Sequence, residues 1–206
     1  MEAALGRFCY FSVLISIMYQ QPYPLILASK SPRRQELLAA MDLKFQVLLK
    51  EVDESYPEGL EPAQIAVYIS EKKAMAFVEE RVNSLVITAD TIVSYQGEIL
   101  GKPADKNQAR EMLQKLSGTK HEVYTGVSLA HGSKMESFFD LTEVFFKTVT
   151  EGQIEHYITQ YNPYDKAGGY GIQDWIGFIA VEKIIGSYTN VMGLPTEKLY
   201  TALSKF

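Results

Sequence analysis

Hydrophobic and polar positions along the chain follow two patterns, one typical of buried strands and one typical of helices. Runs of apolar and β-branched residues predict strands at residues 24–28 and 85–95. Two longer stretches, 121–130 and 135–149, flank a His-Gly-Ser turn and predict an antiparallel hairpin. A last apolar stretch predicts a strand at residues 177–185.

The expected helices each begin at a residue that caps or opens a first turn. They are predicted to start at Ser31, Glu61, Asp105, Thr150 and Thr196. In the second helix, apolar residues recur at helical spacing from Ile65, and Lys72 lies on the same stripe, seven residues further on. Strands and helices in this order predict an α/β fold with a mixed sheet.

The sequence predicts one folded domain that is preceded by an N-terminal extension. With 206 residues, of which 47% are hydrophobic, and no repeats or low-complexity linkers, we expect one domain at residues 23–206, with two lobes at most. We expect residues 1–22 to form an N-terminal extension, because the apolar run 8–18 is too short to span a bilayer and lacks a cleavage site. We expect this extension to be unstructured chain or the product of a translation start upstream of a native Met18, and not a secretory signal.

Charge and cysteine content exclude several classes of protein. The chain has 20 Lys and Arg against 25 Asp and Glu, so its formal net charge is −5 and nucleic-acid binding is disfavoured. A single cysteine and three scattered histidines cannot form a disulfide framework or a Cys/His zinc site, so a metal would need oxygen ligands. With no other long apolar run, we expect no membrane partner and a cytoplasmic location.

The junction between the first strand and the first helix is a candidate phosphate site. Ser29, Lys30, Ser31, Arg33 and Arg34 bring two hydroxyls and three cations to a helix start. Free N–H groups and the positive end of the helix dipole attract anions there, whereas cations alone oppose the dipole. An ordinary solvated first turn capped by Ser31 is the alternative. The spacing of a Walker loop is absent.

Asp90 is the candidate catalytic carboxylate, because it lies inside the apolar segment 85–95. A buried carboxylate needs dedicated backbone donors or a bound cation, and both remain open. Glu54, Lys72 and Lys102 would by themselves be ordinary surface charges. The chain has neither a nucleophile elbow nor a dinucleotide-binding fingerprint.

Several segments in order resemble the Maf family of nucleoside triphosphate pyrophosphatases. They are LASKSPRRQELL at 27–38, ADTIV at 89–93, GKP at 101–103, DKAGGYGIQ at 165–173 and GSYTNVMGLP at 186–195. The resemblance spans about residues 24–200. It implies the elongated, two-lobed α/β fold with a mixed β-sheet that is shared with inosine triphosphate pyrophosphatases.

The same resemblance implies hydrolysis of a nucleoside triphosphate between its α and β phosphates with a divalent metal cation, Mg²⁺ or Mn²⁺. It implies Asp90 as proton acceptor, and we expect Glu54 and Asp90 to hold or face the metal. Phosphate binding is expected at Ser29, Ser31, Arg34, Lys72 and Lys102. Selectivity is implied at Arg33, Thr91 and Gln173, a combination that matches the dTTP/UTP subgroup, with modified pyrimidine nucleotides as further candidate substrates.

The resemblance leaves the assembly and one alternative function open. Members of the family frequently dimerise, so a homodimer is the assembly that the resemblance allows. A protein of another class, a nucleotide-binding regulator of cell division that acts through a protein partner, is the alternative function. A regulator would tolerate changes at Asp90, whereas the carboxylate placed among cations favours the enzyme.

Overall fold

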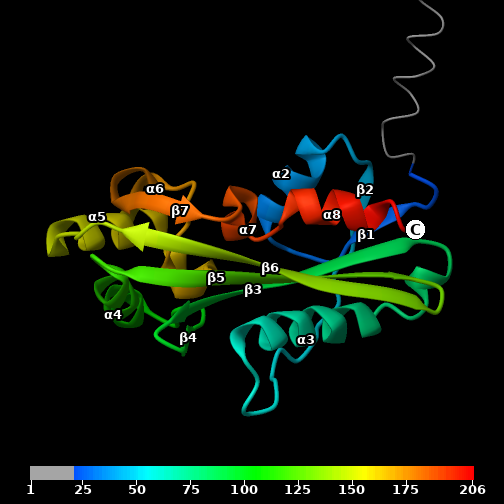
Figure 1. The fold of residues 1–206 in the computed structure, drawn as a ribbon, viewed down its shortest axis with the longest axis horizontal. Coiled ribbons are helices and arrows are strands. Elements are labelled where there is room, and N and C mark those ends of the chain that lie inside the picture. Colours follow the sequence, from blue (N-terminus) through cyan, green and yellow to red (C-terminus); the bar gives the residue numbers. More distant parts are fainter. Residues whose placement is uncertain (1–20) are drawn as a thin grey trace, which may run out of the picture.

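A mixed seven-stranded sheet runs the length of the protein (Figure 1). The computed structural model describes residues 21–206. The strands are β1 (Leu25–Leu27), β2 (Phe45–Val47), β3 (Leu85–Tyr95), β4 (Glu98–Leu100), β5 (Lys120–His131), β6 (Lys134–Phe146) and β7 (Val181–Ile185). Their order is β2-β1-β3-β5-β6-β7, with β4 paired to β3. The pairs β2–β1 and β1–β3 are parallel and the others are antiparallel, so the predicted mixed sheet is confirmed.

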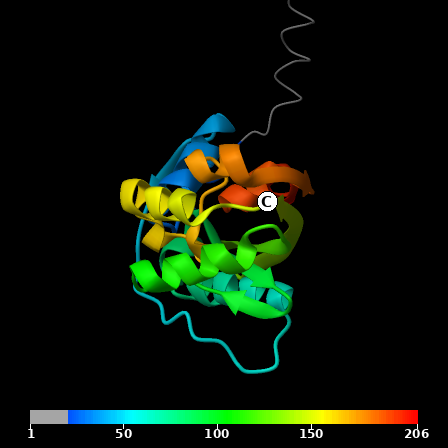
Figure 2. The same cartoon turned by 90° about the vertical axis from the view of Figure 1, so that its left-hand side faces the viewer.

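Helices cover both faces of this sheet. They are α2 (Pro32–Ala40), α3 (Pro62–Met75), α4 (Lys106–Leu116), α5 (Glu151–Tyr161), α6 (Trp175–Ala180), α7 (Tyr188–Met192) and α8 (Thr196–Leu203), with short 3-10 turns η1 (Glu80–Val82), η2 (Pro163–Asp165) and η3 (Ala167–Gly169). Helix α3 lies on one face, and α2, α7 and α8 lie on the other (Figure 1). The segment between β2 and α3, cyan in Figure 2, runs along the outside of the molecule.

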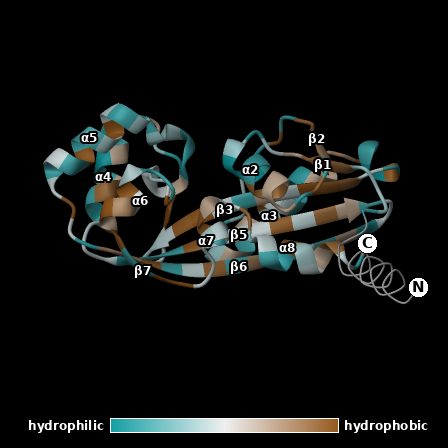
Figure 3. Ribbon diagram, turned by 90° about the horizontal axis from the view of Figure 1, so that it is seen from above, coloured by the Kyte–Doolittle hydropathy of each residue, from teal (hydrophilic) through white to brown (hydrophobic). Residues whose placement is uncertain are grey.

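The two largest hydrophobic clusters mark the two lobes of the molecule. One, here called the α8 lobe, is built around Leu25, Leu38 and Leu199. The other, the α5 lobe, is built around Leu113 and Tyr157. Figure 3 shows α4, α5 and α6 at one end of the long strands and α2, β1 and β2 at the other. The expectation of an elongated, two-lobed fold is confirmed.

Helix α3 packs directly on the sheet because Gly126 of β5 has no side chain. A Cβ atom at this position would lie 2.3 Å from the carbonyl carbon and oxygen of Ala66 and 2.5 Å from the Val67 nitrogen. These are backbone atoms, so the helix would have to move as a unit. Gly126 therefore fixes how close α3 approaches β5.

We expect Gly126→Ala to destabilise the protein by about 3 kcal/mol, which lowers Tm by about 10 °C for a chain of this size. Thermal unfolding followed by circular dichroism measures this. Gly152→Ala is the matched control, because a Cβ there meets no atom within 4 Å and the residue is in α5. A Gly126→Ala variant as stable as the Gly152→Ala variant would contradict this account of the packing.

One predicted strand was wrong in part, and one strand of the sheet was not predicted. The strand predicted at 177–185 begins as helix α6 and becomes strand only at β7. A short continuous apolar run does not separate helix from strand by its periodicity. The three-residue edge strand β2 was not predicted, because its outward residues leave little apolar pattern.

Among residues 21–206, no helix is long and apolar enough to cross a bilayer. The predicted N-terminal extension, residues 1–22, lies almost wholly outside the described residues, and its boundary stays a prediction.

Candidate active site

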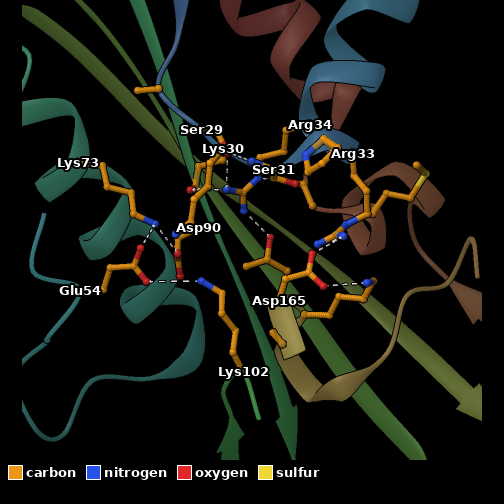
Figure 4. A pocket seen from close by; sticks show the side chains of 18 of the residues that line it. Ser29, Lys30, Ser31, Arg33, Arg34, Glu54, Lys73, Asp90, Lys102 and Asp165 are labelled. Atoms are coloured by element: carbon orange, nitrogen blue, oxygen red, sulfur yellow. Dashed lines mark hydrogen bonds and ion pairs between the residues drawn. The ribbon is translucent and has the colours of Figure 1, made fainter. Parts of the chain in front are cut away.

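A pocket of about 1160 Å³ lies between the two lobes, beside the middle of β3 (Figure 4). Its walls come from the start of α2, from the segment 49–54, from β3 and from the segment 164–173. The predicted site residues Ser29, Ser31, Arg33, Arg34, Glu54, Asp90, Thr91, Lys102 and Gln173 line it. The fold therefore brings together all but one of the residues that the sequence singled out.

The start of α2 presents cationic and hydroxyl side chains to the pocket. Ser31 is the N-cap residue, as predicted, but its hydroxyl makes no capping hydrogen bond. Its N–H group instead donates to Ser29 Oγ at 3.2 Å. The first turn contains no acidic side chain, and Lys30, Arg33 and Arg34 line the pocket around it. N–H groups, hydroxyls and cations at a helix start favour a phosphate ligand.

Arg34 is held by the protein itself. Its guanidinium donates to the carbonyls of Gly193 (2.7 Å) and Ala89 (2.9 Å) and to the hydroxyls of Thr91 (2.9 Å) and Ser29 (3.3 Å). Burial lowers the pKa of Arg34 below its usual value. These contacts join α2, β3 and the end of α7, and they leave at most one guanidinium N–H for a ligand. Arg34 thus builds the pocket wall, and phosphate binding by it stays a prediction.

The carboxylate of Asp90 is paired with a lysine at the centre of the pocket. Asp90 lies on β3 opposite Gly126 and is buried. Its Oδ1 atom is 2.7 Å from Lys73 Nζ, which is 2.9 Å from Glu54 Oε1 (Figure 4). Lys102 Nζ lies 3.8 Å from the other oxygen of Glu54. Two carboxylates and two ammonium groups therefore alternate along one wall.

Nearby cationic side chains stabilise the ionised form of the Glu54 carboxyl group. Burial raises the pKa of the Glu54 carboxyl, but the surrounding cations, Lys73 foremost, lower it by more. The pKa of Glu54 consequently lies below its usual value, and the carboxylate is ionised at neutral pH.

Lys72 is the predicted site residue that lies outside the pocket. Its Nζ atom lies 2.9 Å from Asp53 Oδ2 and 3.0 Å from the Ser55 carbonyl oxygen, and Lys72 is not among the pocket-lining residues. The prediction centred the buried face of α3 on its large apolar residues. The observed face is turned by about a quarter of a turn, because Ala66 and other small residues face the sheet. Lys73, and not Lys72, therefore points to Asp90.

Arg33 joins the two lobes across the pocket. Its NH1 atom is 3.0 Å from Asp165 Oδ2, and the other oxygen of Asp165 is 2.8 Å from Lys166 Nζ. Burial raises the pKa of the Asp165 carboxyl, but hydrogen bonds from Lys166 and Arg33 lower it by more, so Asp165 is charged. The guanidinium of Arg33 is thereby oriented at the edge of the pocket.

Gln173 and Thr91 offer polar groups to a ligand in different ways. The Oε1 atom of Gln173 is buried and has no hydrogen-bond partner among residues 21–206, so a donor from a ligand would satisfy it. The hydroxyl of Thr91 already contacts Arg34 NH2 at 2.9 Å and Thr125 Oγ1 at 3.0 Å. Gln173 is thus the more direct candidate for reading a base.

Residues 24–206 match the family described as Maf-like protein. This chain belongs to the Maf-like family. It is similar to the dTTP/UTP pyrophosphatase of Phocaeicola vulgatus, with 49% identity over 187 residues that cover 90% of this chain and 97% of that protein. It is also similar to the dTTP/UTP pyrophosphatase of Cytophaga hutchinsonii, with 46% identity over 181 residues that cover 88% and 83% of the two chains. The resemblance inferred from the motifs is confirmed.

A solved structure supports the fold of this Maf-like chain. The HAM1 protein from Coxiella burnetii superimposes with a TM-score of 0.50 over 89% of this chain and all (100%) of that chain, at 15% identity. At this identity the likeness concerns the fold alone.

The oxygen donors of this Maf-like pocket fit a hard divalent cation. Asp90 and Glu54 both contact the Lys73 ammonium group, so their carboxylates lie close to each other in the pocket. Mg²⁺ is commonly held by one or two carboxylates, substrate phosphates and water. Within residues 21–206, no cluster of three or more His, Cys, Asp or Glu residues suits a metal. A cation here would therefore depend on the substrate for part of its coordination.

Lys73 is the Maf-like site residue that sequence reasoning missed. A signal was present, because Lys73 follows Ala66 by seven residues and Ile69 by four, and both are buried. The predicted stripe leaves out the small residues Ala66, Ser70 and Ala74, which are buried. Counting them would have placed Lys73 at its centre.

Proposed function

We propose that this chain is a nucleoside triphosphate pyrophosphatase that hydrolyses dTTP and UTP to the monophosphate and pyrophosphate, with modified pyrimidine nucleotides as further substrates. The names of its relatives support this activity. The observation that carries the proposal is the buried Asp90 carboxylate, held by Lys73 in a pocket whose rim is the cationic start of α2. A regulator that only binds the nucleotide is not favoured by those names.

In this proposal, Asp90 acts on the attacking water. The water oxygen forms a bond to the α-phosphorus, and the bond from that phosphorus to the α–β bridging oxygen breaks. Asp90 accepts the proton of the water, and pyrophosphate leaves with the electron pair of the broken bond. A carboxylate with an ordinary pKa of about 3.9 is a weak base, so orienting the water is as important as removing its proton.

The cations of the pocket stabilise the charge that develops on the leaving group. Lys102 and Lys73 lie beside Glu54, and the start of α2 supplies N–H groups and the hydroxyl of Ser31. Fixed donors of this kind favour the transition state because they need no reorganisation during the reaction. Asp90 and Glu54 would hold a divalent cation, which when bound supplies charge neutralisation to the phosphates.

Gln173 is the proposed reader of the base. An amide has one acceptor and two donors, so it pairs with the imide edge of thymine or uracil, where an N–H lies beside a carbonyl oxygen. The unpartnered Oε1 atom of Gln173 suits that N–H. Cytosine presents an acceptor at the same position. We propose that Arg33 and Thr91 complete the selection by fixing the edge of the pocket.

We expect Gln173→Ala to reduce kcat/KM for UTP and dTTP by about ten- to a hundredfold, with a smaller loss for CTP. The reason is that the imide N–H loses its acceptor, the Gln173 Oε1 atom, whereas cytosine has no N–H at that position. Steady-state pyrophosphate release for dTTP, UTP, CTP and GTP measures this. Equal losses on all four nucleotides would mean that Gln173 supports the loop without reading the base.

The proposed activity is tested by incubating the purified protein with the same four nucleotides and Mg²⁺ and separating the products. We expect UMP and pyrophosphate from UTP, and the corresponding products from dTTP. Tight nucleotide binding without turnover would instead support the regulator. A cytoplasmic location and a homodimer remain predictions of the sequence and the resemblance.

A further inference from the structure

The segment that carries Gln173 is hydrogen-bonded to one buried hydroxyl group, that of Tyr157. Tyr157 of α5 is fully buried. Its hydroxyl oxygen accepts the Gly171 N–H at 3.0 Å, and its O–H donates to Asp174 Oδ2 at 2.7 Å. Burial, together with the hydrogen bond to Asp174, raises the pKa of Tyr157 well above its usual value. The hydroxyl therefore stays protonated and serves as donor and acceptor at once.

The Asp174 side chain accepts the Tyr157 hydrogen bond and does not cap helix α6. It occupies the N-cap position of α6, where an aspartate usually accepts a hydrogen bond from the first helical turn. The Asp174 side chain makes no capping hydrogen bond. Its carboxylate is turned to Tyr157 instead, and it also lies 3.7 Å from Lys166 Nζ. The direction of the Asp174 side chain is therefore set by its contact with α5, whereas its backbone carbonyl accepts the Gly177 N–H of α6 at 2.9 Å.

Gly171 and Asp174 leave Gln173 little freedom. The Asp174 N–H donates to the Gly171 carbonyl at 3.0 Å, which closes a tight turn around Gln173. A Cβ atom at Gly171 would lie 2.6 Å from Asp174 Oδ2 and 3.0 Å from Gln173 Nε2. Both ends of the turn are thus fixed by Tyr157, and the Gln173 amide packs against one of them.

The same contacts connect the two sides of the pocket. Lys166 contacts both Asp174 and Asp165, and Asp165 holds Arg33 of the opposite lobe. Opposite charges therefore alternate from Arg33 through Asp165 and Lys166 to Asp174, which accepts the hydrogen bond of the Tyr157 hydroxyl. Arg33 is thereby linked to the turn that carries Gln173 by one continuous set of contacts.

We propose that Tyr157 is a positioning residue for base selection, which aligns the Gln173 amide with the base through its hydrogen bonds to Gly171 and Asp174. This inference rests on the proposed pyrophosphatase function. Tyr157 does not line the pocket, so its effect on the base acts through the turn that it holds.

We expect Tyr157→Phe to lower the ratio of kcat/KM for UTP to that for CTP by about tenfold, the scale of one hydrogen bond to a charged group. The loss should appear chiefly in KM for UTP, because Asp90 and the phosphate-binding wall are unchanged. Asp174→Asn, which keeps an acceptor for the Tyr157 hydroxyl but not the charge, should give a smaller fall in the same ratio.

The matched control is Tyr161→Phe, one turn further along α5. Its ring stacks on Tyr157 at 5.2 Å between centroids, but its residue is 40% exposed. This variant removes the same hydroxyl group from the same helix and should leave the UTP-to-CTP ratio unchanged. In the double variant Tyr157→Phe with Gln173→Ala, the ratio should equal that of Gln173→Ala alone, because Tyr157 acts through Gln173.

The inference is overturned if Tyr157→Phe lowers kcat/KM equally for UTP and CTP, or if its effect adds in full to that of Gln173→Ala. If Tyr157→Phe does not fold, an unchanged ratio in Asp174→Asn overturns it. A wild-type protein that releases no pyrophosphate from any of the nucleotides would refute the proposed function itself. An active wild-type protein whose UTP-to-CTP ratio is the same in Tyr157→Phe would refute only the role of Tyr157.

Discussion

Replacing Asp90 by asparagine is expected to lower kcat for UTP at least about a hundredfold, the scale of losing a general base. The two side chains are nearly isosteric, and the Asp90 side chain is only 12% exposed, so the substitution alters charge and basicity rather than volume. Asparagine can still accept a hydrogen bond from Lys73 but cannot take the proton of the attacking water. Initial rates of pyrophosphate release, with unfolding curves for both proteins, give the comparison.

Asp140→Asn is the control for this substitution. Asp140 is a carboxylate of similar exposure, 14%, paired with Lys198 at 2.6 Å, and it lies outside the pocket. Its replacement should cost no activity. A folded Asp90→Asn variant that releases pyrophosphate at a near-normal rate would refute the role given to Asp90.

The second large effect is expected at Lys73. Lys73→Met should lower kcat/KM for UTP by about a hundredfold, the scale of removing one fixed donor from a site of developing negative charge. It also leaves Asp90 and Glu54 facing each other without the ammonium group that joins them. The two carboxylates then repel each other, which disfavours their charged forms.

The pH dependence of the Lys73→Met variant follows from the charge on Glu54. Lys73 is the foremost of the cations that hold the Glu54 pKa below its usual value, so removing it raises that pKa. Activity that needs the Glu54 carboxylate ionised is lost as the pH falls through its pKa. The acid limb of kcat/KM should therefore move to higher pH in the variant.

Lys72→Met is the control for this experiment, since Lys72 is the preceding residue on the same helix and pairs with Asp53. It should change kcat/KM less than about threefold and leave the acid limb in place, in keeping with an exposed ion pair. A larger loss in Lys72→Met than in Lys73→Met would contradict the assignment of the site lysine.

Features fixed by neighbouring residues could be predicted from the sequence. Asp105 and Thr150 begin helices as expected, and each side chain accepts a hydrogen bond from the first turn. The β-branched pattern around Asp90 placed it correctly inside β3. These elements depend on contacts within a few residues, which a single sequence displays directly.

Features that depend on distant residues could not be predicted in this way. Which face of α3 meets the sheet depends on Gly126, sixty residues after Ala66. The pairing of Arg33 with Asp165 joins residues 132 positions apart. The sequence therefore indicated which residues gather at the pocket, but not which partner each one contacts.

The central claim, that water directed by Asp90 attacks the α-phosphorus, is tested most directly by hydrolysing UTP in water enriched in ¹⁸O and measuring the label in each product by mass spectrometry. The account predicts one ¹⁸O atom in UMP and none in pyrophosphate, because the new bond forms at the α-phosphorus. Label in pyrophosphate, or the release of UDP and inorganic phosphate, would contradict it.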